Sequence, residues 1–243
     1  MTRLRVVVAV LGFTAASATA REAIVTDRPD SAAVLPMGST QIETLWEYCR
    51  ERHGEGHSWL APNLLVRHGL SDRAELRIEA PGWAWPAGEA VQSGDISIGG
   101  KLRLSGEGAE IPRALTVFAT LPSGSARESQ GRSDYGAWLA AERSLGDLYL
   151  LINAGGSSLY LDGTRHWKGI LWLSVGGDLR PGTAWYGELY ADFPEGSRWE
   201  PLTTWGVSLS ANGKTQWDLY AGRGLDGKGP SFFGGVGYSV RFD

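Results

Sequence analysis

The alternation that decides the fold is clearest in DRAELRIEA, residues 72–80, where charged and apolar side chains take turns. Arg73, Glu75, Arg77 and Glu79 fall on one parity, and the residues between them are alanine, leucine and isoleucine. Because successive side chains of a β-strand point to opposite faces, this segment predicts a strand with one charged and one apolar face. The signs also alternate along the charged face, so its side chains can pair with one another.

This period of two extends along most of the chain after residue 38. It predicts twelve strands, at residues 40–48, 59–68, 72–80, 94–104, 112–121, 134–143, 147–155, 167–179, 183–193, 201–211, 215–222 and 231–242. One face of these strands is almost free of charge, and the other carries Glu43, Glu47, Arg67, Arg73, Glu75, Arg77, Glu79, Asp95, Lys101, Arg103, Asp147, Lys168, Asp178, Glu188, Asp192, Asp218 and Arg241. The sequence therefore predicts an all-β chain.

Two architectures fit this alternation equally well. In a soluble lipocalin-like barrel the apolar face points inward, whereas in an outer-membrane barrel it faces lipid. The connections between the strands discriminate, because tight turns are expected at residues 69–71, 144–146, 180–182 and 212–214. Most of the other connections are longer, for instance residues 81–93, 122–133 and 156–166. Short periplasmic turns that alternate with longer external loops are typical of transmembrane β-barrels.

Aromatic residues near the strand ends favour the same architecture. On the apolar face they occur at Trp46 and Tyr48, Trp185 and Phe193, and Phe232 and Phe242. Aromatic girdles flank the apolar band of membrane barrels, and strands of about ten residues cross a bilayer when they are tilted. We therefore predict a closed antiparallel transmembrane β-barrel of about twelve strands, with short periplasmic turns and longer external loops. Leu65, Phe118 and Trp172 are exceptions, because they fall on the charged face.

The first twenty residues have the features of a cleaved secretory signal peptide. Arg3 and Arg5 precede an apolar run over residues 6–16, and Ala18-Thr19-Ala20 forms a cleavage site. Residues 21–38 are expected to form an extended segment, and residues 39–243 the barrel. This organisation predicts export to the outer membrane of a Gram-negative bacterium.

Composition and motifs argue against other classes of function. A net charge of −4 offers no basic surface for nucleic acid, and a single cysteine excludes a disulfide framework. Cys49, His53 and His57 have a spacing that metal sites use, but they lie in the first expected long loop and have no evident fourth ligand. No serine or cysteine stands at a recognisable nucleophile spacing from a histidine. We therefore expect no enzyme activity, no metal and no cofactor.

Several ordered motifs resemble one known family. They are TDRPD (26–30), GSTQIE (38–43), NLLVRHGLS (63–71), ELR (75–77), GDI (94–96), GGK (99–101), LPSG (121–124), GELY (187–190), QWDL (216–219) and FGGVG (233–237). Together they resemble the outer-membrane transporter family labelled for the MetA pathway of phenol degradation. The resemblance implies a β-barrel that passes small, often aromatic or hydrophobic, compounds across the outer membrane, and it brings no catalytic residues.

The function predicted from these observations is that of a passive channel for small solutes, in contact with outer-membrane lipid. Its lumen is expected to be lined by Glu43, Arg67, Arg73, Glu75, Arg77, Glu79, Asp95, Lys101, Arg103, Glu188 and Asp218. Asp27, Arg28 and Asp30 of the extended segment are expected to pair with these charges as a plug. The alternative prediction is a soluble periplasmic lipocalin-like carrier of an apolar ligand.

Overall fold

A computed structural model describes residues 30–52, 56–88, 90–125, 129, 131–161, 163–195, 199–227 and 229–243. The expected signal peptide, together with Asp27 and Arg28, lies outside these residues. The strands are β1 (Thr40–Arg50), β2 (His57–Ser71), β3 (Ala74–Ala80), β4 (Trp83–Pro86), β5 (Gln92–Ser93), β6 (Ile96–Arg103), β7 (Arg113–Leu121), β8 (Tyr135–Leu145), β9 (Leu148–Leu161), β10 (Thr164–Arg180), β11 (Thr183–Pro194), β12 (Glu200–Ala211), β13 (Thr215–Gly224) and β14 (Phe232–Phe242). The part of the chain that the structure describes contains no helix long and apolar enough to cross a membrane.

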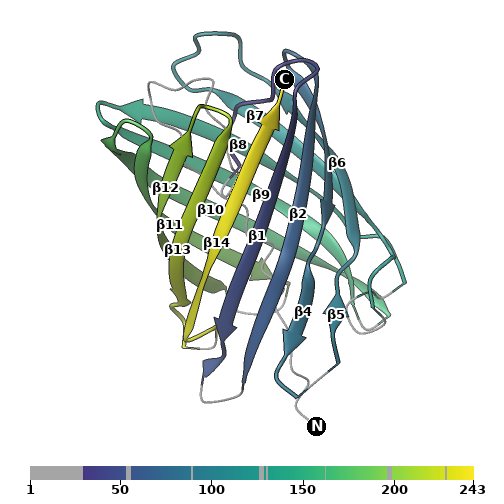
Figure 1. The fold of residues 1–243 in the computed structure, drawn as a ribbon. Coiled ribbons are helices and arrows are strands. Elements are labelled where there is room, and N and C mark those ends of the chain that lie inside the picture. Colours follow the sequence, from purple (N-terminus) through teal and green to yellow (C-terminus); the bar gives the residue numbers. More distant parts are fainter. Residues whose placement is uncertain are drawn as a thin grey trace.

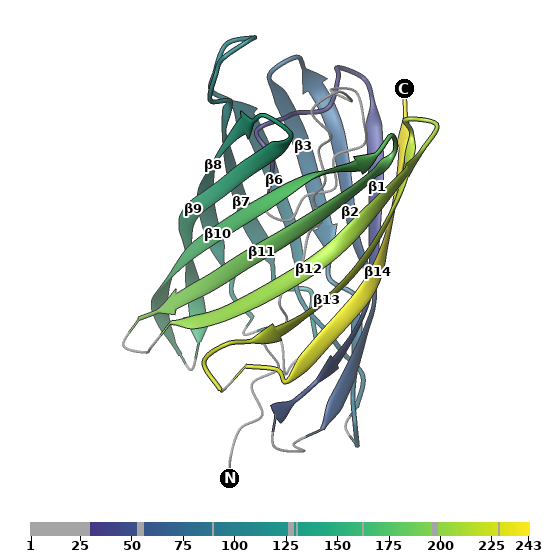
Figure 2. The ribbon, with the colours of Figure 1, turned by 90° about the vertical axis from the view of Figure 1, so that its left-hand side faces the viewer.

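Twelve of these strands close into an antiparallel barrel (Figure 1). Around the barrel β1 is followed by β2, β3 and then β6 to β14, and the ring closes because β1 pairs with both β2 and β14. The strands are strongly tilted and wrap around one interior, as a view from the side shows (Figure 2). The predicted fold class is confirmed, and every predicted strand overlaps an observed one.

The ends of the barrel follow the predicted alternation of short and long connections, with two exceptions. The connection from β6 to β7, residues 104–112, is long although it lies at the end that carries the tight turns. Thr40 pairs with Phe242, so the first strand begins and the last strand ends at the end of the barrel that carries the short turns. Asn212 and Gly213 show how such a turn is made, because both have positive φ angles, of 50° and 65°. Asn-Gly adopts this backbone with little strain, and its twist matches that of the two strands.

The other exception is the long loop predicted over residues 156–166. There β9 and β10 remain paired as far as Leu161 and Thr164, so most of the predicted loop is a continuation of the two strands. Gly163, with a φ of 84°, permits the tight reversal that this hairpin needs. The prediction of a loop was wrong because glycine and serine at 155–158 break the alternation without ending the strands.

The predicted loop over residues 81–93 also contains short strands. After β3 the chain turns at Pro81 and Gly82, and β4 then continues along β2, with Ala61 opposite Trp83. A Cβ atom on Gly82 would lie 2.7 Å from the carbonyl carbon of Pro62, so only glycine fits this crossing. β5 pairs with β4, and the two extend the sheet at the long-loop end of the barrel.

The two faces of the wall are inverted relative to a soluble protein. Leu102, Val117 and Leu219 point outward and are 46%, 47% and 48% exposed, whereas Arg67 and Glu75 point inward and are each 1% exposed. Soluble proteins bury apolar side chains and expose charged ones. A barrel with this inversion is suited to a lipid environment, and the structure does not favour the lipocalin-like alternative.

Candidate functional site

A charged layer lies inside the barrel. It consists of the cations Arg67, Arg77 and Lys101 and the carboxylates Glu43, Glu75 and Asp30. Its first half is centred on Arg67 of β2. Its guanidinium donates two hydrogen bonds of 2.9 Å to the carboxylate of Glu75 on β3, and a third of 3.3 Å to Glu43 on β1. Pairs in which an arginine meets a carboxylate through two parallel bonds are the strongest and most directional of salt bridges. The three side chains therefore tie together three neighbouring strands of the wall.

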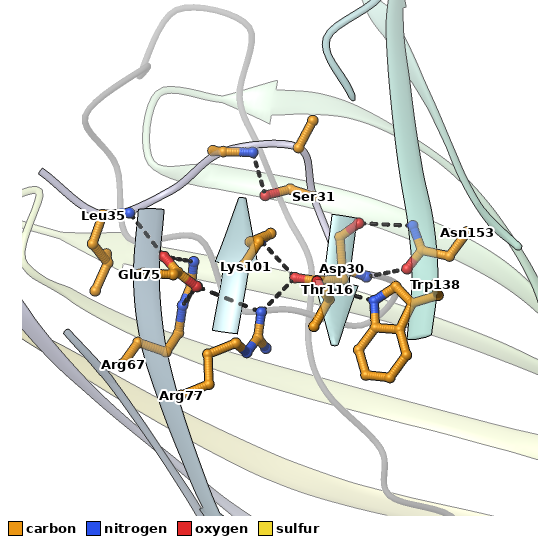
Figure 3. Close-up of polar contacts among 12 residues, drawn as sticks. Asp30, Ser31, Leu35, Arg67, Glu75, Arg77, Lys101, Thr116, Trp138 and Asn153 are labelled. Atoms are coloured by element: carbon orange, nitrogen blue, oxygen red, sulfur yellow. Dashed lines mark hydrogen bonds and ion pairs between the residues drawn. The ribbon is translucent and has the colours of Figure 1, made fainter. Parts of the chain in front are cut away.

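The second half of the charged layer is built around Asp30, from the segment that precedes β1 (Figure 3). One carboxylate oxygen accepts from Arg77 Nη1 at 2.8 Å and from Lys101 Nζ at 2.6 Å. The other accepts from Thr116 Oγ1 at 2.5 Å and from Trp138 Nε1 at 3.1 Å. Four strands, β3, β6, β7 and β8, thus converge on one buried carboxylate.

The residues that follow Asp30 are also held to the inner wall. The backbone of Asp30 exchanges two hydrogen bonds with the side chain of Asn153, of 2.6 and 2.8 Å. Farther on, Ala32 N donates to Glu142 and Leu35 N donates to Glu75. Main-chain and side-chain bonds together keep this segment, residues 30–35, inside the barrel.

A glycine allows the same segment to leave the interior. Gly69 lies near the end of β2, and a Cβ atom there would stand 2.0 Å from the carbonyl oxygen of Pro36. The backbones instead exchange hydrogen bonds, from Gly38 N to Gly69 O and from Gly69 N to Ser39 O. The segment therefore passes the wall at the short-turn end, where β1 begins.

The ionic groups of the layer balance one another. Three cations and three carboxylates are joined by its salt bridges: Arg67, Arg77 and Lys101, with Glu43, Glu75 and Asp30. An ion that is buried without a partner destabilises a protein by several kcal/mol. Asp30 supplies one of the three negative charges, so the wall and the N-terminal segment depend on each other electrostatically.

The other predicted wall residues are more dispersed. Glu79 lies near Asn63, whose amide nitrogen is 3.5 Å from its carboxylate. Asp218 is fully buried and accepts hydrogen bonds from Ser208 and Gln216. Glu188 is 9% exposed on β11. Glu188 and Asp218 lie on strands other than those of the charged layer.

Arg73 and Asp95, predicted to line the lumen, lie instead at the ends of the barrel. Arg73 is exposed in the turn before β3, where its guanidinium donates to the carbonyl oxygens of Arg103 and Leu104. Asp95 precedes β6 and accepts from the backbone of Ser123 and Gly124 at 2.8 and 2.7 Å. Both residues lie outside the strands because β3 and β6 begin two residues later than expected. Arg103 is the last residue of β6, with its side chain 25% exposed.

An arc of inward-facing aromatic rings lies beside the charged layer, and the sequence analysis did not identify it as a unit. Phe118, Trp138, Trp172 and Tyr190, here called the aromatic arc, are only partly buried. Successive ring centroids are 5.4, 5.9 and 5.1 Å apart. Phe118 and Trp172 are two of the apolar residues that fall on the charged face of the predicted strands. The signal that could have found the arc is the recurrence of aromatic residues at this parity on neighbouring strands.

Another part of the interior, which borders the aromatic arc at Tyr190, is filled by a different cluster. Leu45, Ala184, Tyr186, Leu202, Tyr220 and Phe233 are buried against one another. They come from β1 and from β11 to β14. The Tyr220 hydroxyl donates a hydrogen bond of 2.6 Å to Glu47.

The spacing of Cys49, His53 and His57 corresponds to no metal centre in the described residues. His53 lies outside them, and the Cys49 sulfur is instead 3.8 Å from a Glu51 oxygen. Elsewhere among the residues that the structure describes, no three His, Cys, Asp or Glu side chains are grouped so that they could hold a metal ion.

Comparison with known proteins finds solved structures that have a similar fold. No family model and no curated protein matches the chain. Among solved structures, the COG4313 outer membrane channel from Pseudomonas putida F1 is similar, with a TM-score of 0.70 and 17% identity over 88% of this chain and 99% of that one. The KdgM porin in complex with oligogalacturonate and the NanC porin give TM-scores of 0.57 and 0.55, each at 11% identity, over 84% of this chain and 98% and 99% of theirs.

These likenesses bear on the fold, because all three identities are low. They agree with the barrel topology and with the inverted faces of its wall. The resemblance noted in the sequence is thus confirmed as far as the barrel is concerned, and its link to phenol degradation stays a prediction. The chain has the fold of the outer-membrane β-barrel channels.

Proposed function

We propose that this protein is an outer-membrane channel through which small solutes, aromatic or hydrophobic ones among them, enter a Gram-negative cell passively. The observation that carries the proposal is the closed barrel with an apolar outer face and charged and aromatic side chains inside. Lipid solvates the first surface, and a solute that enters the barrel meets the second. We assign the wall of the pathway to Glu43, Arg67, Glu75, Arg77, Glu79, Lys101, Glu188 and Asp218.

In this proposal residues 30–35 act as a plug, with Asp30 as its anchor. The support is the number and kind of groups that hold Asp30: two cations, one hydroxyl and one indole N–H. A solute crosses only when this segment shifts, because it occupies the interior at the short-turn end. Asp27 and Arg28 are assigned to the same plug on the basis of the sequence.

Conductance measurements test the channel and the plug separately. Asp30→Asn keeps the shape of the side chain but removes the charge that Arg77 and Lys101 share. In planar bilayers we expect it to raise the open probability several-fold over the original protein. Asp72→Asn, an exposed change in a turn at the same end, is the matched control and should change nothing.

Each possible failure of that experiment has its own meaning. A lack of ion conductance and of liposome swelling in both Asp30→Asn and the original protein would contradict the channel. Equal conductance in the two would contradict the plug alone. Heat-modifiable migration on a gel establishes beforehand that both proteins form folded barrels.

The orientation of the barrel makes a further prediction. We place the short turns in the periplasm and the long loops outside, as in other outer-membrane barrels. In a Cys49→Ala background, Ala87→Cys at the long-loop end should react with an impermeant thiol reagent on intact cells. Ala211→Cys, which is also exposed but lies at the short-turn end, should react only after the cells are opened. The reverse pattern would invert the proposed orientation.

A further inference from the structure

The groups around Asp30 have the arrangement of a carboxylate-binding site. Four side chains hold its carboxylate and are here called the carboxylate cradle: Arg77, Lys101, Thr116 and Trp138. One carboxylate oxygen accepts from the two cations, and the other accepts from the hydroxyl group and the indole N–H. An ionised carboxylate has about four lone-pair sites on its two oxygens. The donors of the cradle therefore match what one carboxylate can accept.

The cradle belongs to the barrel wall, whereas the carboxylate that fills it does not. The four donors project from β3, β6, β7 and β8, and Figure 3 shows them arranged around Asp30. These strands pair with one another through their backbones. Asp30 belongs to residues 30–35, which lie along the inner wall and form no strand. The ring of strands therefore holds the donors in place independently of the group that they bind.

The charges of the wall at this level lack one anion. In the charged layer the wall supplies three cations and two carboxylates, and Asp30 supplies the remaining negative charge. The side chain of Lys101 is fully buried, and that of Arg77 is 11% exposed. Because a buried cation without a partner is strongly destabilising, the cradle favours a group with one negative charge over a neutral group.

Asn153 on β9 adds a second recognition element beside the cradle. Its side-chain oxygen accepts from the backbone N–H of Asp30 at 2.6 Å, and its side-chain nitrogen donates to the backbone carbonyl oxygen of the same residue at 2.8 Å. Asn153 is completely buried. A carboxylate that carries amide groups nearby, as Asp30 does, therefore gains two hydrogen bonds that a simple carboxylate lacks.

We infer that the carboxylate cradle is a binding site for small monocarboxylate solutes, and that Asp30 is its resident ligand. The carboxylate of the solute takes the position of the Asp30 carboxylate when residues 30–35 shift, and an amide group beside it binds Asn153. This inference rests on the proposed channel and plug and deepens them, because it names a chemical class of solute that displaces the plug.

Asp30 competes with a free solute because it is tethered to the wall. A group joined to its site by a short chain acts at an effective concentration on the order of millimolar or higher. A soluble carboxylate must reach a comparable concentration to displace Asp30, but it meets no such competitor in Asp30→Ala. Acetate is the missing aspartate side chain with one added hydrogen atom, so it fits the space that this substitution leaves.

Rescue of Asp30→Ala by acetate tests the site without any measurement of conductance. The variant is refolded into lipid vesicles in sodium acetate, in sodium chloride, or in acetamide with sodium chloride, all at equal ionic strength. The folded fraction on a heat-modifiability gel and the urea midpoint are the readouts. We expect acetate to bind at least about tenfold more tightly than chloride or acetamide, because it alone is an anion whose two oxygens reach both pairs of donors.

Equal effects of acetate, chloride and acetamide would overturn the inference. A variant that folds only in acetate would support it, since the folded fraction is itself a readout. Asp72→Ala, an exposed change in a turn, is the matched control and should not respond to acetate. An equal response of Asp72→Ala would show that acetate acts elsewhere, and would also overturn the inference.

A second substitution locates the bound acetate. Lys101→Met in the Asp30→Ala background removes one cation of the cradle and returns the charged layer to neutrality. In chloride we therefore expect the double variant to have a higher urea midpoint than Asp30→Ala. We also expect it to bind acetate at least about tenfold more weakly, because one hydrogen bond to a charged group is lost. An undiminished response to acetate in the double variant would contradict binding in the cradle.

Conductance of the original protein tests the displacement of the plug. The probe is aspartate blocked by an acetyl group and a terminal amide, which has one carboxylate and the amide groups that Asn153 holds in Asp30. Asparagine blocked in the same way has nearly the same shape and no charge. In planar bilayers we expect millimolar blocked aspartate to raise the open probability at least about twofold, and blocked asparagine to leave it unchanged. No rise with blocked aspartate, or an equal rise with both, would overturn the displacement.

The site and the channel can fail separately in these experiments. Rescue by acetate without conductance in any of the proteins contradicts the channel but supports the carboxylate-binding site. Conductance that rises in Asp30→Asn, together with no rescue of Asp30→Ala by acetate, contradicts the site but leaves the channel and its plug intact.

Discussion

The wall formed by β2, β3 and β6 and the wall formed by β11 to β14 fill the same barrel in different ways. The first carries Arg67, Glu75, Arg77 and Lys101, whose charges are balanced only together with Glu43 of β1 and Asp30 of the N-terminal segment. The second carries a cluster of apolar and aromatic side chains that pack against one another.

This difference separates a part of the interior that depends on the N-terminal segment from a part that does not. Coulombic attraction between ions is strong in a medium of low dielectric constant. The free-energy cost of removing the ions from water offsets it unless every ion has its partner. Apolar packing has no such condition. We call the wall of β2, β3 and β6 the charged wall, and the wall of β11 to β14, with the cluster around Tyr186 and Phe233, the aromatic wall. Displacement of residues 30–35 should therefore disturb the charged wall and leave the aromatic wall in place.

The largest effect is expected from Arg67→Met. This change leaves Glu43 and Glu75 buried beside each other without their shared cation, and should lower the free energy of unfolding by about 3–5 kcal/mol. Urea unfolding in lipid vesicles measures it. Arg223→Met, at an exposed position on the β13 strand, serves as a control and should cost little. A small effect of Arg67→Met would show that water reaches the charged layer.

A charge introduced on the outer face should destabilise the two walls equally. Ile98→Arg, outside the charged wall, and Leu219→Arg, outside the aromatic wall, should each cost about 2–4 kcal/mol, because both place a cation in the hydrocarbon region. Both side chains are exposed on the barrel surface, at 42% and 48%. The same unfolding assay applies. Unequal costs would mean that the two outer faces meet different environments.

A smaller effect is expected inside the aromatic wall. Tyr220→Phe removes the hydrogen bond to Glu47 while the ring remains packed, and should cost about 1–3 kcal/mol because a buried acceptor loses this donor. Its cost should be the same in Asp30→Asn as in the original protein, since distant sites are additive. A double-mutant cycle by urea unfolding measures this, and strong coupling would contradict the independence of the two walls.

The smallest effect is expected from an exposed salt bridge at the short-turn end. The hydrogen bond from Lys214, together with the nearby charges of Lys214 and Arg241, lowers the pKa of Asp243 below its usual value. Because the folded pKa is the lower one, this contribution to stability is present above the ordinary aspartate pKa and is lost as the pH falls. Asp243→Asn should therefore reduce stability slightly at pH 7, less so with added salt, and not at all in strong acid. Urea midpoints at several pH values check it.

Much of the barrel could be predicted from local pattern, because each strand needs only an alternation of side chains to declare its two faces. The segment 72–80 already separates Arg77 from Ile78, and the structure places the first inside and the second outside. The Asn212-Gly213 turn is equally local, since two residues with positive φ determine it. Loops were harder to predict at residues 156–166 and 81–93, where glycine and proline interrupt a strand without ending its pairing.

The candidate site could be predicted only in part, for a reason of distance along the chain. Arg67 and Glu75 are eight residues apart across one hairpin, so the pattern places them together. Asp30 is separated by 71 residues from Lys101 and by 108 from Trp138. No periodicity connects such positions, although the sequence had indicated that Asp30 could pair with charges inside.

By itself, then, the amino-acid sequence determined the all-β class, the strands, the separation of each strand into a charged and an apolar face, and the tight turns, because these depend on residues that are neighbours along the chain. Only the tertiary structure decided which carboxylate completes the charged layer and that Phe118, Trp138, Trp172 and Tyr190 form one arc. Closing the barrel sets the height of each strand relative to the others. That stagger brings these side chains to one level, and it is a property of the whole ring of strands.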